Sequence, residues 1–571
     1  MKALGAALLL SLLPAAAFAA AEGQPVSGTV DPSRVVPPAE APSTPIAPPS
    51  RPAEPSTPSP EEIAPRFVLS EVRFDGATTI PDSGLASAWL DLKGKPVSLR
   101  DLRGVARKAE GIYAAAGYPF VAIVVTPQAV ADGVVHLRVV EGHISNLTVL
   151  AKDPVARRQA TAAFAPLVDR QPLAVGDVDA AYQEARSVPG LAVAGALRRG
   201  DVPGGMDLVV QATRQHWRVY ANVNDLYPDT VGPWGALLGV DYFGDSAWGD
   251  QTSGQFYTSL SSGRQYVVRL SHQRWLNAGG TNVSAMVLFA WADPSGVVAP
   301  LDLASDVQIG RIALAQPIYR RGDFKLEAEG AFEVDDQRTR IFKTLALSTD
   351  KLQILSGSLT GEWRPSTGGD ASLTVEIRKG VNIAGASRPG DPNLSRFGAD
   401  PQATVGQFRF SGETPEFYRI SLAGRLEGQV AGSSLTAPDQ YAIGNLSMVR
   451  GYQPGSAFGD SAIAGSIEIR FGPFPVTDRF RIQPFGFYDA ARLWVLTPGA
   501  HSAQDVASYG GGIRVDAPGL VHLELMYAQP DRPFTVGGPT PKGRVLLNLT
   551  VGLNAVYDAL AGRSGNGGHH Q

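Results

Sequence analysis

The chain of 571 residues contains no cysteine, which excludes disulfide bonds, a thiolate nucleophile and a cysteine-ligated metal. Charged residues account for only 18%, and the net charge of −4 lacks the basic excess that is typical of nucleic-acid-binding proteins. Beyond the N-terminus, no apolar run approaches the roughly 20 residues that a membrane helix needs. If the protein crosses a membrane, it must therefore do so as a closed β-barrel, because only helices and closed barrels satisfy every backbone polar group in lipid.

Catalytic motifs are also missing from the sequence. The eight histidines are scattered, with no H-E-x-x-H pair, and there is no G-x-x-x-x-G-K-[ST] loop to hold a nucleotide. The GSAFG sequence at residues 455–459 is not the G-x-S-x-G of a serine hydrolase. We therefore expect a protein without enzymatic activity, cofactor or metal site.

The N-terminal region has the features of an exported protein. Lys2 precedes an apolar run from Ala3 to Leu13, and Ala17-Phe18-Ala19 fits a small-residue cleavage site. This pattern predicts a secretory signal peptide over residues 1–21 rather than a membrane anchor. Residues 22–65 are rich in Pro, Ala, Ser and Thr, which predicts an extended or disordered linker, with a Pro-rich docking ligand as the alternative.

The sequence between residues 66 and 214 predicts two small α+β domains in tandem. In the first, residues 66–142, the segments RFVLSEVRF, FVAIVV and GVVHLRVVEG are typical of strands, and SGLASAWLDL and SLRDLRGVARKAEGIYAAAGY of helices. The second, residues 143–214, repeats this β-α-α-β-β order.

From residue 215 to residue 557 the pattern changes to alternation with a period of two, which indicates strands with one apolar and one polar face. Alternation alone would also fit a soluble sandwich. However, about 16 segments of roughly the 9 to 11 residues that a tilted membrane strand needs can be placed here. Together with the export signal, they predict a transmembrane β-barrel with a polar lumen, followed by a polar tail at residues 558–571. The predicted strands start near residues 216, 234, 252, 264, 281, 306, 323, 350, 371, 403, 417, 461, 479, 506, 520 and 544.

A long connection, QVAGSSLTAPDQYAIGNLSMVRGYQPGSAFGDS, separates the eleventh and twelfth predicted strands. It contains too many apolar residues for a solvated tether, so it should pack on something. In the following strand, RFRIQPFGFYDAARLW, the alternation points Asp489 into the lumen. If the loop folds back into the barrel, Arg450 can reach Asp489, and a guanidinium fork on a carboxylate suits the fixing of one orientation. The alternative is that Arg450 is a surface arginine.

These segments resemble the two-partner secretion transporters of the outer-membrane barrel-assembly superfamily, which include haemolysin and filamentous-adhesin exporters. The resemblance implies a VRGY/F motif at the tip of a loop inside the barrel, matched here by Val449-Arg450-Gly451-Tyr452. It also implies an F-x-D-x-G motif on the inner wall that receives the arginine. Phe487 and Asp489 match that motif, whereas its last position is Ala491 instead of glycine.

The segment GYPFVAIVVTPQAVADGVVHLRVVEGHISNLTV resembles the junction of two polypeptide-transport-associated (POTRA) domains. Members of this family have two such domains in the periplasm, before a barrel of 16 strands in the outer membrane. The resemblance implies export of a partner exoprotein, such as an adhesin, a haemolysin or a similar β-helical protein, driven largely by cargo folding outside. The cargo would bind somewhere within residues 66–214, at residues that the sequence does not identify.

Two other functions remain open at this stage. A barrel-assembly factor of the same superfamily shares the loop motif but usually has more periplasmic domains, and a passive porin has no need for paired periplasmic domains. Two features depart from the family pattern: the Pro-rich linker does not suit the N-terminal plug helix that some members have, and a polar tail follows the last strand, which does not end the chain at an aromatic residue. The expected partners are the exoprotein and outer-membrane lipid, without nucleic acid.

Overall fold

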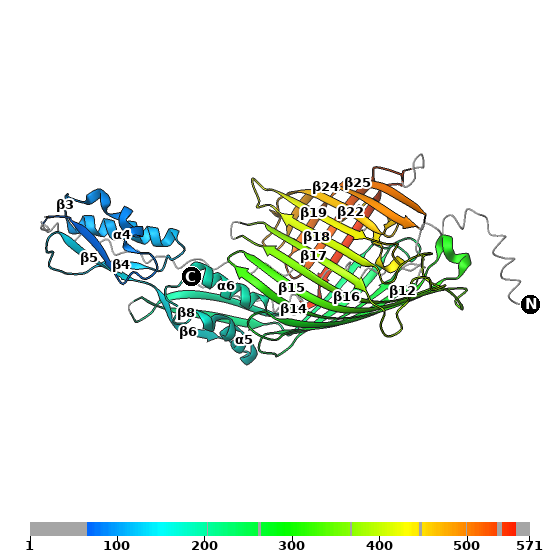
Figure 1. The fold of residues 1–571 in the computed structure, drawn as a ribbon, viewed down its shortest axis with the longest axis horizontal. Coiled ribbons are helices and arrows are strands. Elements are labelled where there is room, and N and C mark those ends of the chain that lie inside the picture. Colours follow the sequence, from blue (N-terminus) through cyan, green and yellow to red (C-terminus); the bar gives the residue numbers. More distant parts are fainter. Residues whose placement is uncertain are drawn as a thin grey trace, which may run out of the picture. The chain divides into compact units, whose positions relative to one another are not determined.

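The computed structural model describes residues 66–554 except 203, 261–263, 366–367, 445–447, 498 and 534–539. The predicted signal peptide, the Pro-rich linker and the polar tail at 558–571 lie outside the described residues. The chain divides into two compact units. One holds two α+β domains together with the turn Asp245–Asp250, and the other holds the rest of a large barrel (Figure 1).

The first α+β domain packs a three-stranded sheet against helix α4 (Leu99–Ala115). Strand β5 is central, with β2 parallel and β4 antiparallel to it. Helix α4 begins after Ser98, whose side chain forms a reciprocal capping box with Asp101. The predicted helix SGLASAWLDL is broken into short pieces, because Trp89 (φ −135°) leaves helical geometry. The remaining elements are β1 (Phe67–Val68), β2 (Glu71–Asp75), α3 (Asp82–Leu85), η2 (Ala86–Ala88), η3 (Leu90–Leu92), β3 (Pro96–Val97), β4 (Ala122–Val125) and β5 (Val134–Val140).

The second α+β domain has the strand order β6-β8-β7, with β6 parallel and β7 antiparallel to β8. Asp153 caps helix α5 by accepting a hydrogen bond from the amide of Val155, and Pro154 occupies the first helical position. The rings of Phe164 and Tyr182 join the two helices edge to face in the core. The elements are β6 (His143–Leu150), α5 (Pro154–Phe164), η4 (Ala165–Leu167), α6 (Val175–Ser187), β7 (Leu191–Arg199) and β8 (Gly205–Arg214).

Hydrogen bonds and an apolar contact fix the junction between these two domains. The side chain of Gln171 donates to the Glu141 carbonyl at 2.9 Å, and the amide of Leu173 donates to the Gly142 carbonyl at 2.8 Å. Phe120, from the first domain, packs against the core of the second. The tandem therefore has a defined joint rather than a free linker.

Sixteen long antiparallel strands form the closed barrel, and β27 pairs with β9 to complete it. The sixteen-stranded barrel after α+β domains confirms the predicted fold class. The short strand β23 (Phe474–Pro475) pairs only with the start of β24. The long strands are β9 (Trp217–Asn224), β10 (Gly235–Phe243), β11 (Asp250–Ser259), β12 (Arg264–Trp275), β13 (Asn282–Asp293), β14 (Ala304–Arg321), β15 (Phe324–Ile341), β16 (Leu345–Trp363), β17 (Asp370–Gly380), β18 (Thr404–Glu413), β19 (Ile420–Ala431), β22 (Ser461–Phe471), β24 (Arg481–Thr497), β25 (Ala500–Ala517), β26 (Val521–Pro530) and β27 (Arg544–Gly552).

The predicted strand length was wrong for five of these strands. Strands β14, β15, β16, β24 and β25 have 17 to 19 residues. The predicted starts near 350 and 506 were correspondingly late, because β16 begins at Leu345 and β25 at Ala500. The additional residues are paired in long hairpins, so regular pairing continues beyond the length that a membrane span requires.

The alternation of the barrel strands separates two faces. On β24, Tyr488 is 49% exposed, whereas its neighbours Phe487 and Asp489 are buried. On β19, Leu422 and Leu426 likewise point outward. Within the described part of the chain, no helix is long and apolar enough to cross a membrane.

Candidate functional site

The connection between β19 and β22, residues 432–460, is hereafter called the pore loop. It contains η6 (Ala437–Asp439) and returns through a short ladder in which β20 (Tyr441–Ala442) pairs with β21 (Phe458–Gly459). Its tip, residues 448–452, is buried against the inward faces of β22, β24 and β25. The loop therefore folds back onto the inner wall of the barrel.

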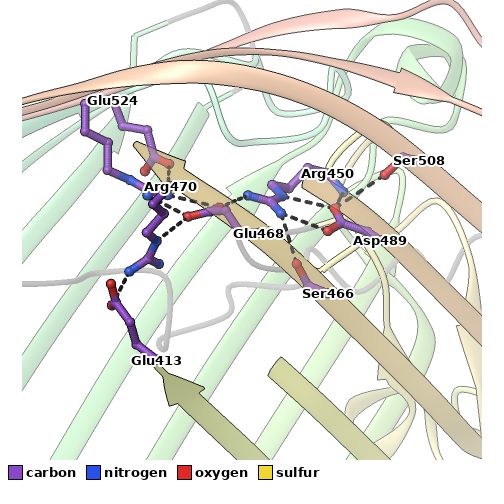
Figure 2. Close-up of polar contacts among 9 residues, drawn as sticks. Glu413, Arg450, Ser466, Glu468, Arg470, Asp489, Ser508 and Glu524 are labelled. Carbon is purple, nitrogen blue, oxygen red and sulfur yellow. Dashed lines mark hydrogen bonds and ion pairs between the residues drawn. The ribbon is translucent and has the colours of Figure 1, made fainter. Parts of the chain in front are cut away.

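Arg450 at the tip is 2% exposed and makes five hydrogen bonds to the wall. Its Nε and Nη2 donate to the two carboxylate oxygens of Asp489 at 3.0 and 2.8 Å, and its backbone amide also donates to Asp489 at 3.0 Å. Nη1 donates to Glu468 at 2.8 Å and Nη2 to the Ser466 hydroxyl at 3.0 Å. The structure thus brings together the two charged residues that the sequence singled out, as Figure 2 shows.

Phe487 contributes through its ring rather than through a hydrogen bond. The Arg450 guanidinium carbon lies 3.5 Å from the centre of the Phe487 ring. Phe487 and Asp489 alternate on one strand, so both face inward and hold the same guanidinium from two directions.

Gly451 is required by the closeness of the wall. A Cβ atom at this position would lie 2.8 Å from the backbone nitrogen of Pro530 and 2.8 Å from the Ser508 Cβ. The amide of Gly451 donates to the Ser508 hydroxyl at 3.1 Å, and that hydroxyl in turn lies 3.4 Å from Asp489. Any larger residue would push the tip away from the wall.

Tyr452 and Val449 complete the tip on its other sides. The Tyr452 hydroxyl donates to the Arg532 carbonyl at 2.6 Å, and Arg544 donates to the Tyr452 carbonyl at 3.0 Å. Val449 is fully buried in an apolar cluster with small wall residues, among them Ala491. The alanine that replaces the motif glycine therefore belongs to the same buried cluster as the loop tip.

The structure adds a charged network that sequence reasoning missed. Glu468 accepts from Arg450, from Arg514 at 2.6 and 3.2 Å, and from Arg470 at 2.7 Å. Arg514 also donates to Glu524 at 2.8 Å, and Arg470 donates to Glu413 (Figure 2). The inward parity of each residue was readable from the alternation, but which of the many inward charges meet depends on strand register.

The Pro-Gln, Asp-Gly and Glu-Gly pairs of the segment that resembles a POTRA junction include residues with structural roles in the first α+β domain. Gln128 bonds both the amide and the carbonyl of His136, at 2.8 and 2.6 Å. Gly133 adopts φ +75°, and a Cβ there would lie 2.3 Å from the Val68 carbonyl oxygen. These residues shape the domain and do not by themselves mark a binding surface.

Glu141, the acidic residue of the Glu-Gly pair, is buried at the end of β5. Its carboxylate accepts hydrogen bonds from the amides of Thr78 and Thr79 at 3.0 and 3.1 Å and from the Thr78 hydroxyl. Burial on its own would raise the pKa of Glu141, but these hydrogen bonds outweigh it and hold the pKa below the usual value. Glu141 therefore locks the Thr78–Thr79 turn to the central strand as an ionised group.

The geometry of the loop site suits the holding of the loop in one position. A buried guanidinium with two carboxylates fixes position strongly, because removing either partner leaves an uncompensated charge. Barrel, POTRA domains and an arginine-tipped loop in the lumen define an outer-membrane protein transporter with its POTRA domains in the periplasm. Residues 67–142 match the POTRA domain of ShlB type, and residues 295–515 match the family described as haemolysin secretion/activation protein ShlB/FhaC/HecB. The chain belongs to this family of two-partner secretion transporters.

Relatives and solved structures agree with this assignment. A heme/hemopexin transporter protein, HuxB of Haemophilus influenzae, is 19% identical over 78% of this chain and 80% of its own length. The structure of CdiB from Escherichia coli has a TM-score of 0.67 at 18% identity, covering 89% of this chain and 94% of that one. CdiB from Acinetobacter baumannii has a TM-score of 0.57 at 14% identity, with 86% and 91% covered. These two structures show the same fold.

Proposed function

We propose that this transporter carries one unfolded exoprotein of the adhesin or haemolysin kind from the periplasm to the cell surface, and that the pore loop moves when the cargo passes. The main support for this proposal is the way in which Arg450 is buried and bonded at the barrel wall. A residue in the middle of the connection 432–460 is 2% exposed and bonded to three wall side chains, Asp489, Glu468 and Ser466. Such a contact supports a resting state in which the loop lies in the lumen.

The wall residues that bind the loop tip also bond to one another, so they can keep their positions when the loop leaves. When Arg450 departs, Glu468 keeps Arg514 and Arg470, whereas Asp489 keeps, among its hydrogen bonds to described residues, the one from the Ser508 hydroxyl. The receptor for the loop therefore stays in place, and the unpaired Asp489 draws Arg450 back after passage. Release of the loop therefore costs free energy mainly because the Asp489 carboxylate loses its arginine.

The POTRA domains would capture the cargo by strand addition. Each three-stranded sheet has two edge strands, β2 and β4 in the first domain and β6 and β7 in the second. Pairing with an edge uses backbone hydrogen bonds, which any extended segment can supply. This mode suits an unfolded cargo better than a side-chain pocket does, and it requires no catalytic group in this chain.

The outer face of the barrel would contact outer-membrane lipid. Large apolar side chains are exposed there, for example Leu422 at 48%, Ile467 at 68% and Leu373 at 45%. They alternate with inward polar residues, as lipid-facing strands require. We propose no nucleic-acid partner, since the formal net charge is −4.

The test is a proteomic comparison of medium, cell surface and outer membrane from cells with and without this chain. We expect one large secreted or surface protein to disappear while other outer-membrane barrels keep their abundance. Replacing Arg450 with Ala should reproduce that loss although the barrel is still inserted. A general fall in outer-membrane barrels would overturn the proposal in favour of barrel assembly.

A further inference from the structure

The pore loop is held at a second place, where it rejoins the wall. Asp460, its last residue, is fully buried. Its carboxylate accepts hydrogen bonds from the amide of Leu435 at 2.8 Å and from the amide of Leu496 at 2.6 Å. Leu435 lies on the outgoing limb of the loop and Leu496 on β24, so this one carboxylate joins both limbs to the wall.

Arg396 completes this arrangement from a different connection, residues 381–403 between β17 and β18. Its Nη1 and Nη2 donate to the two carboxylate oxygens of Asp460, the second at 3.2 Å. Nη1 also donates to the Leu435 carbonyl and Nη2 to the Leu496 carbonyl at 3.4 Å. We call Arg396, Leu435, Asp460 and Leu496 the neck clasp.

The surrounding contacts reinforce the neck clasp. The amide of Ala437 donates to the Ser395 hydroxyl at 2.9 Å, and the amide of Asp400 donates to the Ser434 carbonyl at 2.8 Å. Leu435 is fully buried in an apolar cluster with Ala403, which belongs to the same connection as Arg396. Connection 381–403 therefore lies along the outgoing limb of the pore loop.

The neck and the tip are held in different ways. At the tip, one arginine side chain supplies four of the bonds, so all of the ion pairs of the tip are lost together when Arg450 swings away, and neutral hydrogen bonds and the bond from Arg544 to the Tyr452 carbonyl remain. At the neck, the Asp460 carboxylate accepts hydrogen bonds from three separate chain segments, and opening would take the Leu435 amide away from this fully buried charge. Between them lie Gly444 (φ +88°) and Gly455 (φ +69°), and the Gly455 amide donates across the hairpin to the carbonyl of Ile443, the residue before Gly444, at 2.9 Å.

We infer that Arg396 is a positioning residue for export, and that the neck clasp stays closed while cargo passes. The pore loop then moves by pivoting its tip about a fixed neck, and it is not withdrawn as a whole. This inference rests on the proposed function, because it presumes that the loop moves during export.

The first test removes the arginine. In cells that make the full chain, Arg396→Ala should reduce secretion of the protein identified by deletion several-fold. In planar bilayers the purified variant should open more often, because the tip loses its fixed pivot. Arg388→Ala is the matched control: it removes an exposed arginine from the same connection, and should leave both readouts unchanged. Normal secretion and conductance of a folded, inserted Arg396→Ala barrel would overturn the inference.

The second test closes the neck covalently. The chain has no native cysteine, so Ser395→Cys with Ala437→Cys can form a single disulfide between adjacent positions. Secretion should continue with the disulfide formed, and the disulfide should rescue Arg396→Ala without restoring its charge. If oxidation blocks secretion and reduction restores it, the neck must open and the inference fails.

Arg450→Ala, tested in parallel, separates the role of the pore loop in export from the role of the neck clasp. Normal secretion by that variant would remove the proposed role of the pore loop. Impaired secretion by Arg450→Ala, together with a block by the neck disulfide, would remove only the fixed neck. The disulfide pair also tests the inference in the wild-type background if Arg396→Ala does not fold.

Discussion

Individual residues of the pore-loop tip are fixed by two different forces. Arg450 is held by charge and hydrogen bonds, whereas position 451 must be glycine because the tip lies too close to the strands behind it for a Cβ atom. A change at Arg450 therefore weakens an attraction, and a change at Gly451 introduces a repulsion. Both changes should unseat the tip, the first by the loss of bonds and the second by a steric clash.

Gly451→Ala should displace the tip even though every charged partner remains. The added methyl group would lie 2.8 Å from the backbone nitrogen of Pro530, which cannot move without distorting β26. Overpacking of this kind costs about 1–3 kcal/mol, so the seated loop should become a minor state and channel openings should increase. Gly432→Ala is the control, because a Cβ there meets nothing within 4 Å; equal conductance of the two variants would contradict the prediction.

An exchange of the charges of Arg450 and Asp489 should restore little export. The sequence alone favours rescue, since it pairs these two residues in isolation. In the structure, an aspartate at position 450 would face Glu468, whose carboxylate lies 2.8 Å from the present guanidinium. The shorter aspartate would stand farther from Glu468 than the guanidinium does, but it would share the same buried place, where like charges repel. Secretion should therefore stay near the level of Arg450→Ala, and recovery to wild-type secretion would show that Glu468 is dispensable.

At the scale of elements, the sequence alone predicts most of the barrel strands and the direction of their side chains. The period-two alternation placed the strand starts except those of β16 and β25, and it turned Asp489 inward, because successive side chains of a strand point to opposite faces. The pairing of Glu468 with Arg514 and of Arg396 with Asp460 was not predictable. Those contacts join residues 46 and 64 positions apart, and they depend on strand register and loop path.

Glu141→Gln should loosen the start of the first POTRA domain. The lowered pKa of Glu141 means that its ionised form stabilises the fold at pH values above the ordinary pKa of 4.5. That contribution is lost as the pH falls through the lowered folded pKa. At pH 7 the amide hydrogens of Thr78 and Thr79 should exchange roughly tenfold faster in the variant, as expected for about 1.4 kcal/mol.

Hydrogen-exchange mass spectrometry of the full chain measures this effect. The difference between wild type and Glu141→Gln should shrink once the pH is well below 4.5, because wild-type Glu141 is then protonated as well. Glu71→Gln is a suitable control, since Glu71 lies on an exposed part of the same domain and its side chain is 46% exposed. A difference that does not change with pH would contradict the assigned role of the carboxylate.

At the scale of the whole molecule, barrel closure depends on a short seam. Strands β27 and β9 pair over five residue pairs, from Asn548 with Asn224 to Gly552 with Tyr220. Side chains supplement this ladder: Asn222 donates to Asn548 at 2.7 Å and to Thr550 at 2.9 Å. The backbone amide of Val219 is satisfied by the Asn554 side chain at 2.5 Å. Polar side chains at the seam thus replace part of the backbone pairing that other strands have.

Asn222→Leu should consequently lower the temperature at which the barrel unfolds. The substitution removes both donated bonds and leaves Asn548 and Thr550 without that partner, at a cost of about 1–3 kcal/mol. Thr360→Val is the matched control, because it also removes an inter-strand side-chain bond, to Thr374 at 3.0 Å, but from strands joined by ten residue pairs. The midpoint of heat-induced mobility change on denaturing gels should fall for Asn222→Leu and stay near the wild-type value for Thr360→Val. Equal midpoints would mean that the five-pair ladder alone closes the barrel.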